Sequence, residues 1–466
     1  MMNYAKLKYA LLGIVLIQIS CKKFIELEPP KNSLVQETVF QNNDQATSAV
    51  TGIYATLATS SNYASGGPYS ITCFAGVSSD ELIGYHVTNI PFYENLLTPE
   101  FSNLLPFYSG PFKTVYTANA VLEGLATSTG VTPPIKEELK GEALFIRAFA
   151  YFYLVNLYGP VPLQLITDYH VTQSEARTPT AQIYEQILSD LKAAESLLPE
   201  SYVTAGRVRP NKSAVQALLA RTYLYQKDWE NAEKYATLVL DKTSTYALAD
   251  LDGVFLSNSK EAIWQLFPAA NSNAQDGNLF ILLATPAYVS LSSAFAQNVF
   301  EPGDKRQNSW VKSYTDNTGT YYYPYKYKIK SGTSPSEYSM VLRLAEQYLI
   351  RAEARINQPG KITSGIEDLN IIRTRSRLQP TESVPNPLPS LSAGLNKEVA
   401  LLAVEQERRA ELFSEWGHRW FDLKRTGRAD AVLALLKHKW RSASVLYPIP
   451  STELSRNHNL TQNDGY

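Results

Sequence analysis

The sequence predicts a mainly α-helical fold in which antiparallel helical hairpins of the tetratricopeptide type support long irregular insertions and a few short strands. Three observations predict this class. Apolar residues recur at helical spacing along most of the 466-residue chain. In residues 213–240 two such helices are separated by only a few polar residues. In two stretches, about 60–110 and 246–336, the helical period disappears and aromatic residues accumulate.

The hairpin of residues 213–240 is the clearest unit. Small residues at Ala220, Ala232 and Ala236 allow close approach of the two helix backbones, at spacings typical of a tetratricopeptide repeat. Any αα-hairpin would show much of the same pattern. This unit alone therefore does not distinguish a general helical hairpin from a tetratricopeptide repeat. A single pair cannot bury both its faces, and other helices must therefore stack on it.

Further helices are expected on both sides of this hairpin, together with one strand. The segment 137–158 is apolar on nearly every side in its second half, so it should be a buried helix, and Arg147 within it should need a polar partner. The other expected helices are 38–57, 112–125, 180–197, 341–356, 365–377 and 397–415, and the expected strand is 261–267.

The first residues indicate processing and lipid attachment. Lys6 and Lys8 precede a short apolar run that ends at Ser20 and Cys21, as in a bacterial lipoprotein signal. We therefore expect a signal peptide at 1–20, a lipid anchor on Cys21, a tether at 21–35 and one domain at 36–466. Ordinary cleavage or an uncleaved anchor are the alternatives. Cys73, the other cysteine, should be an inert buried thiol.

Candidate ligand-binding residues come from the two insertions. The chain has 30 tyrosines, and Tyr joins an apolar ring to a polar hydroxyl, which suits stacking on sugar rings. The same aromatics could instead pack the loops together. Trp264, Trp416 and Trp420 are expected in the core. The candidates are Asp80, Tyr85, His86, Phe92 and Tyr93 in the first insertion, and Trp310, Tyr321, Tyr322 and Tyr323 in the second.

Several function classes lack support in the sequence. The formal net charge of −1 offers no basic field for nucleic acid, and no nucleotide-binding loop, nucleophile elbow or zinc-protease motif occurs. Glu415 and His418 have Glu-x-x-His spacing, but a di-metal site needs two such motifs, so we expect no metal and no cofactor. Helix-surface ion pairs Glu405–Arg409 and Arg408–Glu411 are expected instead.

Four segments together resemble one known family. They are EALFIRAFAYFYLVNLYGPVPL (142–163), VLRLAEQYLIRAEARIN (341–357), LNIIRTRS (369–376) and VEQERRAELFSEWGHRWFDLKRTGR (404–428). In order and spacing they are similar to the SusD/RagB family of Bacteroidetes outer-membrane lipoproteins. The resemblance implies four tetratricopeptide-like helix pairs and a ligand site drawn from the two insertions.

The resemblance also implies a role. Such a protein captures oligosaccharides, or peptides in some members, without cleaving them, and sits on a SusC-like TonB-dependent transporter at the cell exterior, anchored in the outer membrane by its N-terminal lipid. A scaffold that binds only proteins is a second interpretation. A glycan-cleaving enzyme is a third, because paired catalytic carboxylates are defined by distance in space rather than in sequence.

Overall fold

The computed structural model describes residues 39–59, 61–269 and 272–466. The expected signal peptide, the Cys21 anchor and the 21–35 tether lie outside the described residues. Within the described part of the chain, no helix combines the length and apolarity that crossing a membrane requires.

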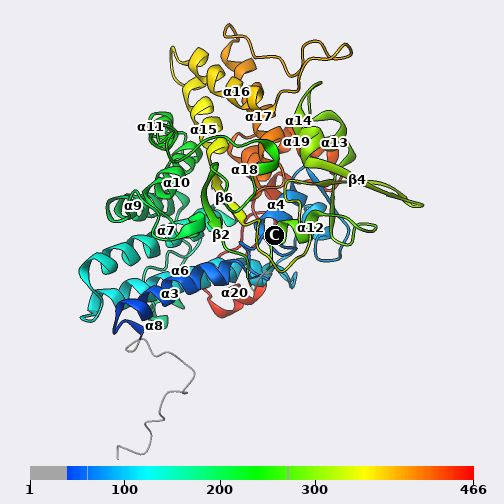
Figure 1. Ribbon diagram of the computed structural model, residues 1–466. Helices are drawn as coiled ribbons and strands as arrows, with labels where there is room; N and C mark the ends of the chain where they lie inside the picture. The colour runs from blue at the N-terminus through cyan, green and yellow to red at the C-terminus, as the bar shows by residue number, and fades with distance from the viewer. Residues whose placement is uncertain (1–38, 60, 270–271) are drawn as a thin grey trace, which may run out of the picture.

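Four antiparallel helix pairs form the scaffold, which confirms the predicted fold class (Figure 1). Consecutive pairs pack on one another through α6 with α7, α9 with α10 and α11 with α15, and α17 (Lys397–Leu412) packs on α15 and α16. The pairs are α3 (Asn43–Leu57) with α6 (Leu104–Thr127), α7 (Pro133–Tyr158) with α9 (Thr180–Leu197), α10 (Lys212–Tyr225) with α11 (Trp229–Leu240), and α15 (Leu344–Ile356) with α16 (Ile362–Ser376).

Local chemistry sets the ends of the central hairpin. The side chain of Asn211 caps α10 by accepting from the backbone N–H of Ala214, and Asp228 caps α11 in the same way. Between the two helices Lys227 takes a φ of 58°, a left-handed conformation that reverses the chain without glycine. Arg147 on α7 was expected to need a polar partner, and that partner is Asp190. The Asp190 carboxylate accepts hydrogen bonds of 2.8 and 2.7 Å from the Arg147 guanidinium.

Short elements fill the segments between the pairs. The short helices are α4 (Ile71–Ser78), α5 (Ile90–Tyr93), α8 (Tyr169–Thr172), α12 (Gln275–Phe280), α13 (Ser293–Asn298), α14 (Lys305–Trp310), α18 (His418–Arg425), α19 (Ala429–Leu436) and α20 (Ser451–Arg456), with 3-10 turns at Ala205–Arg207, Leu251–Gly253 and Ser442–Val445. The expected strand is β2 (Ala262–Leu266), and it pairs with β6 (Ser339–Arg343). Because β6 takes residues 341–343, the helix expected at 341–356 begins only at Leu344.

The two insertions meet in one sheet. Its antiparallel strands run in the order β1 (Leu82–Gly84), β3 (Val289–Leu291), β5 (Gly319–Pro324) and β4 (Val311–Asp316). Strand β1 comes from the first insertion and the other three come from the second. The β4–β5 hairpin extends from the body at the right of Figure 1.

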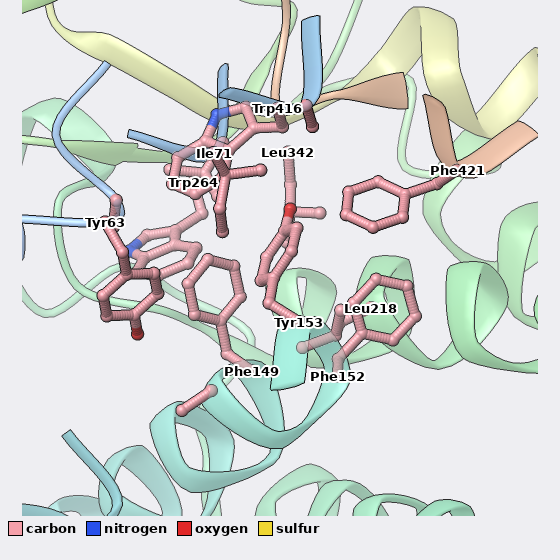
Figure 2. Close-up of a cluster of buried hydrophobic side chains, with 14 of the residues drawn as sticks. Tyr63, Ile71, Phe149, Phe152, Tyr153, Leu218, Trp264, Leu342, Trp416 and Phe421 are labelled. Carbon is pink, nitrogen blue, oxygen red and sulfur yellow. The ribbon is translucent and has the colours of Figure 1, made fainter. Parts of the chain in front are cut away.

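The aromatic core joins α7 to the strands and to the C-terminal segment (Figure 2). Phe149 meets the rings of Trp264 and Trp416 edge to face, with centroids 5.1 and 5.5 Å apart. Trp264 and Trp420 are fully buried and Trp416 is 4% exposed, so all three are core residues, as predicted. The thiol of Cys73 is also buried, and burial raises its pKa to about 12.

The first insertion, expected to be irregular, contains a buried helix. All eight residues of α4 are buried, and Phe74 within it stacks on Phe92 at 4.0 Å. An eight-residue helix that is apolar all round has no period to recognise, which is why its sequence reads as irregular.

The predicted helix-surface pairs of α17 are wrong. Arg408 and Glu411 are buried and Arg409 is partly buried, and their charges bond to other elements of the fold. The ion pairs are Arg409–Asp80 at 2.7 Å, Arg408–Asp422 at 2.7 Å and Arg419–Glu405 at 2.8 Å.

Cations engage Glu415, the carboxylate of the Glu-x-x-His spacing, and its neighbour Glu411. Arg343 donates to Glu411 at 2.8 Å and to Glu415 at 2.7 Å, and Lys326 also donates to Glu415. Burial works against ionisation of Glu411, but the arginines around it hold its pKa well below the usual range. These groups stabilise the junction between the helices and the second insertion.

Candidate functional site

The outer face of the four-stranded sheet carries aromatic side chains that are half-buried or, for Tyr85, 36% exposed. Across β4 and β5, Lys312 lies opposite Tyr323 and Tyr314 lies opposite Tyr321. Cross-strand partners share a face, and successive residues alternate between faces. Tyr322 therefore points to the other side, where it packs against the core. We call Tyr85, Tyr314, Tyr321 and Tyr323 the tyrosine face.

Contacts from both insertions hold the tyrosine face in place. The rings of Tyr85 and Tyr321 meet edge to face with centroids 6.1 Å apart. The hydroxyl of Tyr85 shares a 2.9 Å hydrogen bond with Ser290, and that of Tyr321 shares one of 2.9 Å with Thr318. Burial raises the pKa of Tyr85, Ser290 opposes this, and Tyr321 and Tyr93 raise it further, so Tyr93 belongs to the same neighbourhood.

A hollow of about 270 Å³ borders this face. Its wall includes Tyr288, whose ring stacks on that of His86 with centroids 4.7 Å apart. His86 directly follows Tyr85 in the chain. Thr285, also in the lining of the hollow, donates a 2.6 Å hydrogen bond to Asp316 at the end of β4. Pro68, Asn278, Leu283 and Lys330 also line the hollow. A ligand on the tyrosine face could therefore extend into an adjoining cavity.

Lysines stand beside the aromatic rings. The ring of Tyr325, just beyond β5, has the ammonium of Lys328 at 4.4 Å and that of Lys312 at 5.9 Å from its centre. Tyr323 and Tyr325 meet edge to face at 6.1 Å. The edge of the tyrosine face is thus both aromatic and cationic.

The structure brings together five of the nine candidate residues: Tyr85, His86, Tyr93, Tyr321 and Tyr323. Sequence analysis missed Tyr288, Tyr314 and Lys330. Tyr314 could have been found, because strand alternation places it with Tyr321 and Tyr323 across a short turn. No local signal identified Tyr288 or Lys330.

The other four candidates have different positions. Trp310 is fully buried, and its indole N–H donates to the carbonyl of Leu251 at 3.0 Å. Phe92 is also fully buried. Neither ring faces solvent, so the prediction that they present a surface to ligand is wrong. Asp80 is 9% exposed and bonds Arg409 and Arg419, and Tyr322 lies on the core side of the sheet.

A second cavity, of about 320 Å³, lies in the scaffold between α17, α18 and the α10–α11 turn. Three of its charged lining groups, Arg408, Asp422 and Arg425, are ion-paired with one another. Among the described residues, Trp229 is the one aromatic in the lining of this cavity. The described lining of this cavity therefore has no pair of facing aromatic rings like that of Tyr85 and Tyr321.

Two family matches cover most of the chain. Residues 23–224 match a family described as "Starch-binding associating with outer membrane", and residues 296–444 match the SusD family. SusD-like protein P2 of Formosa agariphila is 24% identical over 514 residues, covering 99% of this chain and 100% of that protein. A SusD-like protein of Bacteroides ovatus is 24% identical over 402 residues, which is 73% of this chain and 69% of that protein.

Solved structures share the fold. A SusD superfamily protein of Bacteroides vulgatus superimposes with a TM-score of 0.79 at 21% identity, covering 92% of this chain and 100% of that chain. A laminarin-binding SusD-like protein gives a TM-score of 0.75 at 21% identity with the same coverage. The matched regions include every helix of the four pairs except α11, as well as part of the sheet, and the chain belongs to the SusD/RagB family.

Proposed function

We propose that this protein is a lipid-anchored, non-catalytic glycan-binding protein of the bacterial surface, which captures oligosaccharides and delivers them to a SusC-like TonB-dependent transporter. The observation that carries the proposal is the meeting of the two insertions, which forms the tyrosine face beside a hollow. Members of the SusD-like family bind substrates and are not catalytic. The fold shared with a laminarin-binding protein supports a sugar as the ligand.

The tyrosine face suits a sugar for physical reasons. Sugar rings present apolar C–H faces, which pack on aromatic rings, and polar edges, which bond hydroxyl and amide groups. The hydroxyls of Tyr85 and Tyr321 are already oriented by Ser290 and Thr318, so less order is lost when a ligand binds. The half-buried rings leave room for the bridging water that shallow polar sites use.

The test replaces Tyr321 and Tyr323, singly, by alanine. A glycan array first identifies a ligand of the unchanged protein, and titration calorimetry then measures its affinity. We expect each substitution to weaken binding by about tenfold or more, as for a central aromatic contact, with no change in the unfolding transition.

Tyr116→Ala is the matched control, because this tyrosine is 56% exposed and lies on the scaffold helix α6 rather than on the sheet. Equal affinity of the Tyr321, Tyr323 and Tyr116 variants would reject the tyrosine face as the ligand site. Binding of peptides but no sugars would favour the peptide-binding alternative. Release of shorter sugars during incubation would expose a hydrolase.

A further inference from the structure

The hollow beside the tyrosine face contains an uncompensated positive charge. Among the residues the structure describes, Lys330 is the one charged residue in its lining. Its ammonium donates to the backbone carbonyls of Asn278 and Ile281, at 2.9 and 2.7 Å. None of the described carboxylates lies within ion-pair distance of it. Carbonyl oxygens orient the ammonium group but do not neutralise it.

Partial burial makes this charge costly. Burial lowers the pKa of Lys330, with no carboxylate to oppose the shift. A half-buried ammonium without a counter-ion gains free energy when an anion takes that place. The unliganded hollow is therefore better suited to an acidic group than to a neutral one.

Two more lysines extend the positive charge along the edge of the tyrosine face. Burial lowers the pKa of Lys328, the charges of Asp252 and Glu337 oppose this, and the neighbouring charge of Lys312 lowers it further. Asp252 lies 3.3 Å from Lys328, but its side chain is 78% exposed, so water and salt screen the pair. Like charges held close together are relieved by a bound anion.

We infer that the ligand is an acidic oligosaccharide, whose rings lie on the tyrosine face while a carboxylate or sulfate group enters the hollow and pairs with Lys330. This inference rests on the proposed function and names the class of glycan that the same site selects. Uronate and sulfate ester share the required chemistry, a compact anion on a sugar ring. The apolar wall beside Lys330, formed by Leu283 and Tyr288, suits the C–H face of that ring.

The experiment compares sugars that differ only in charge. The full mature protein is titrated calorimetrically with an oligogalacturonate and its methyl ester, and with a sulfated galactan oligosaccharide and its desulfated form. We expect the acidic member of at least one pair to bind about tenfold more tightly and to lose affinity with added salt. The pair that shows this preference distinguishes carboxylate from sulfate.

Lys330→Gln should abolish the preference for the acidic member and leave the affinity for its neutral counterpart unchanged. Lys136→Gln is the matched control, because Lys136 is also half-buried and bonds a backbone carbonyl, that of Ser128, at 3.0 Å on the helical scaffold. The control should keep the preference.

Four results would overturn the inference. The first is that both neutral sugars bind as tightly as their acidic counterparts or more tightly, and the second is that only neutral glycans bind on the array. The third is that Lys330→Gln lowers the affinity for both members of a pair equally. The fourth is that an acidic peptide binds more tightly than any sugar. Neutral binding that still depends on Tyr321 would leave the proposed function in place. Absence of binding to any glycan would reject the proposed function itself.

Discussion

Individual side chains in this protein are placed by their long-range partners. Glu81 and Asp80 are neighbours in the chain, yet Asp80 bonds two arginines, whereas Glu81 accepts a single 3.3 Å hydrogen bond from the backbone of Ser414. One carboxyl oxygen of Glu81 has no hydrogen-bond partner among the described residues. Burial, reinforced by the charge of Asp80, raises the pKa of Glu81 to about 8. Its surroundings in the fold therefore favour the protonated form of Glu81.

This environment predicts a pH-dependent stability. The pKa of Glu81 rises on folding from about 4.5 to about 8, so between these values the folded state holds a proton that the unfolded chain has released. Stability should fall as pH rises through this window, by about 1.4 kcal/mol per pH unit from this group. Glu81→Gln should flatten that slope in urea denaturation measured from pH 5 upwards.

Glu398→Gln, an exposed position on α17, should keep the slope of the unchanged protein. An unaltered slope in Glu81→Gln would show that Glu81 is ionised in the fold.

At the scale of elements, the β4–β5 hairpin has surface tyrosines on its outer face and a buried tryptophan at its base. Its outer face carries Tyr314, Tyr321 and Tyr323, whereas its base is fixed by Trp310, the last residue of α14. Lys326 lies 4.7 Å from the centre of the Trp310 ring. The hairpin tip is tied to the rim of the hollow through Asp316, whose pKa the hydrogen bonds from Thr285 and Thr318 lower to about 2.

Trp310→Ala should therefore affect the fold rather than ligand contact. Loss of a fully buried indole leaves a cavity and an unpaired carbonyl at Leu251, at a cost of about 3–5 kcal/mol. Urea denaturation should show this loss, while the glycan affinity of the remaining folded protein should be close to that of the unchanged protein. Tyr169→Ala, at a side chain that is 62% exposed, should change stability by no more than about 0.5 kcal/mol. An unchanged denaturation midpoint in Trp310→Ala would contradict the buried position.

At the scale of the whole molecule, the helix pairs act as a frame that brings distant segments together. Strand β1 and strand β3 pair although about two hundred residues separate them, with Ile83 opposite Ser290. The scaffold helices between them, α6 to α11, hold the two insertions at one place. The proposed ligand site at the sheet and the proposed lipid anchor at Cys21 therefore belong to separate regions of the chain.

The attachment can be tested on the intact protein. Cys21→Ala should move the protein from the membrane fraction to the soluble fraction in cells that lack the transporter partner, because several acyl chains are needed for stable anchoring. Cys73→Ala is the control and should stay with membranes, since this thiol is buried in the fold. Persistence of the Cys21 variant in the membrane fraction would show that lipid on Cys21 is not the anchor.

Local sequence patterns were sufficient for the scaffold. Residues 180–197 and the hairpin at 213–240 match the observed helices closely, because amphipathic periodicity and side-chain caps act over a few residues. The need of Arg147 for a partner also followed from its apolar neighbours. The aromatic content of the two insertions led to the prediction that they hold the ligand site. Five of the nine candidate residues do lie together at the sheet, and their contact with ligand stays a prediction.

What the sequence by itself determined was the stack of helical hairpins, the family resemblance and the two aromatic-rich insertions proposed to hold the ligand site. Only the tertiary structure decided which rings face outward. Trp310 and Tyr321 are both aromatic residues of one insertion, but one is buried and the other lines the tyrosine face. Strand register and contacts between segments far apart in the chain determine that difference, and neither is encoded in the composition of a single loop.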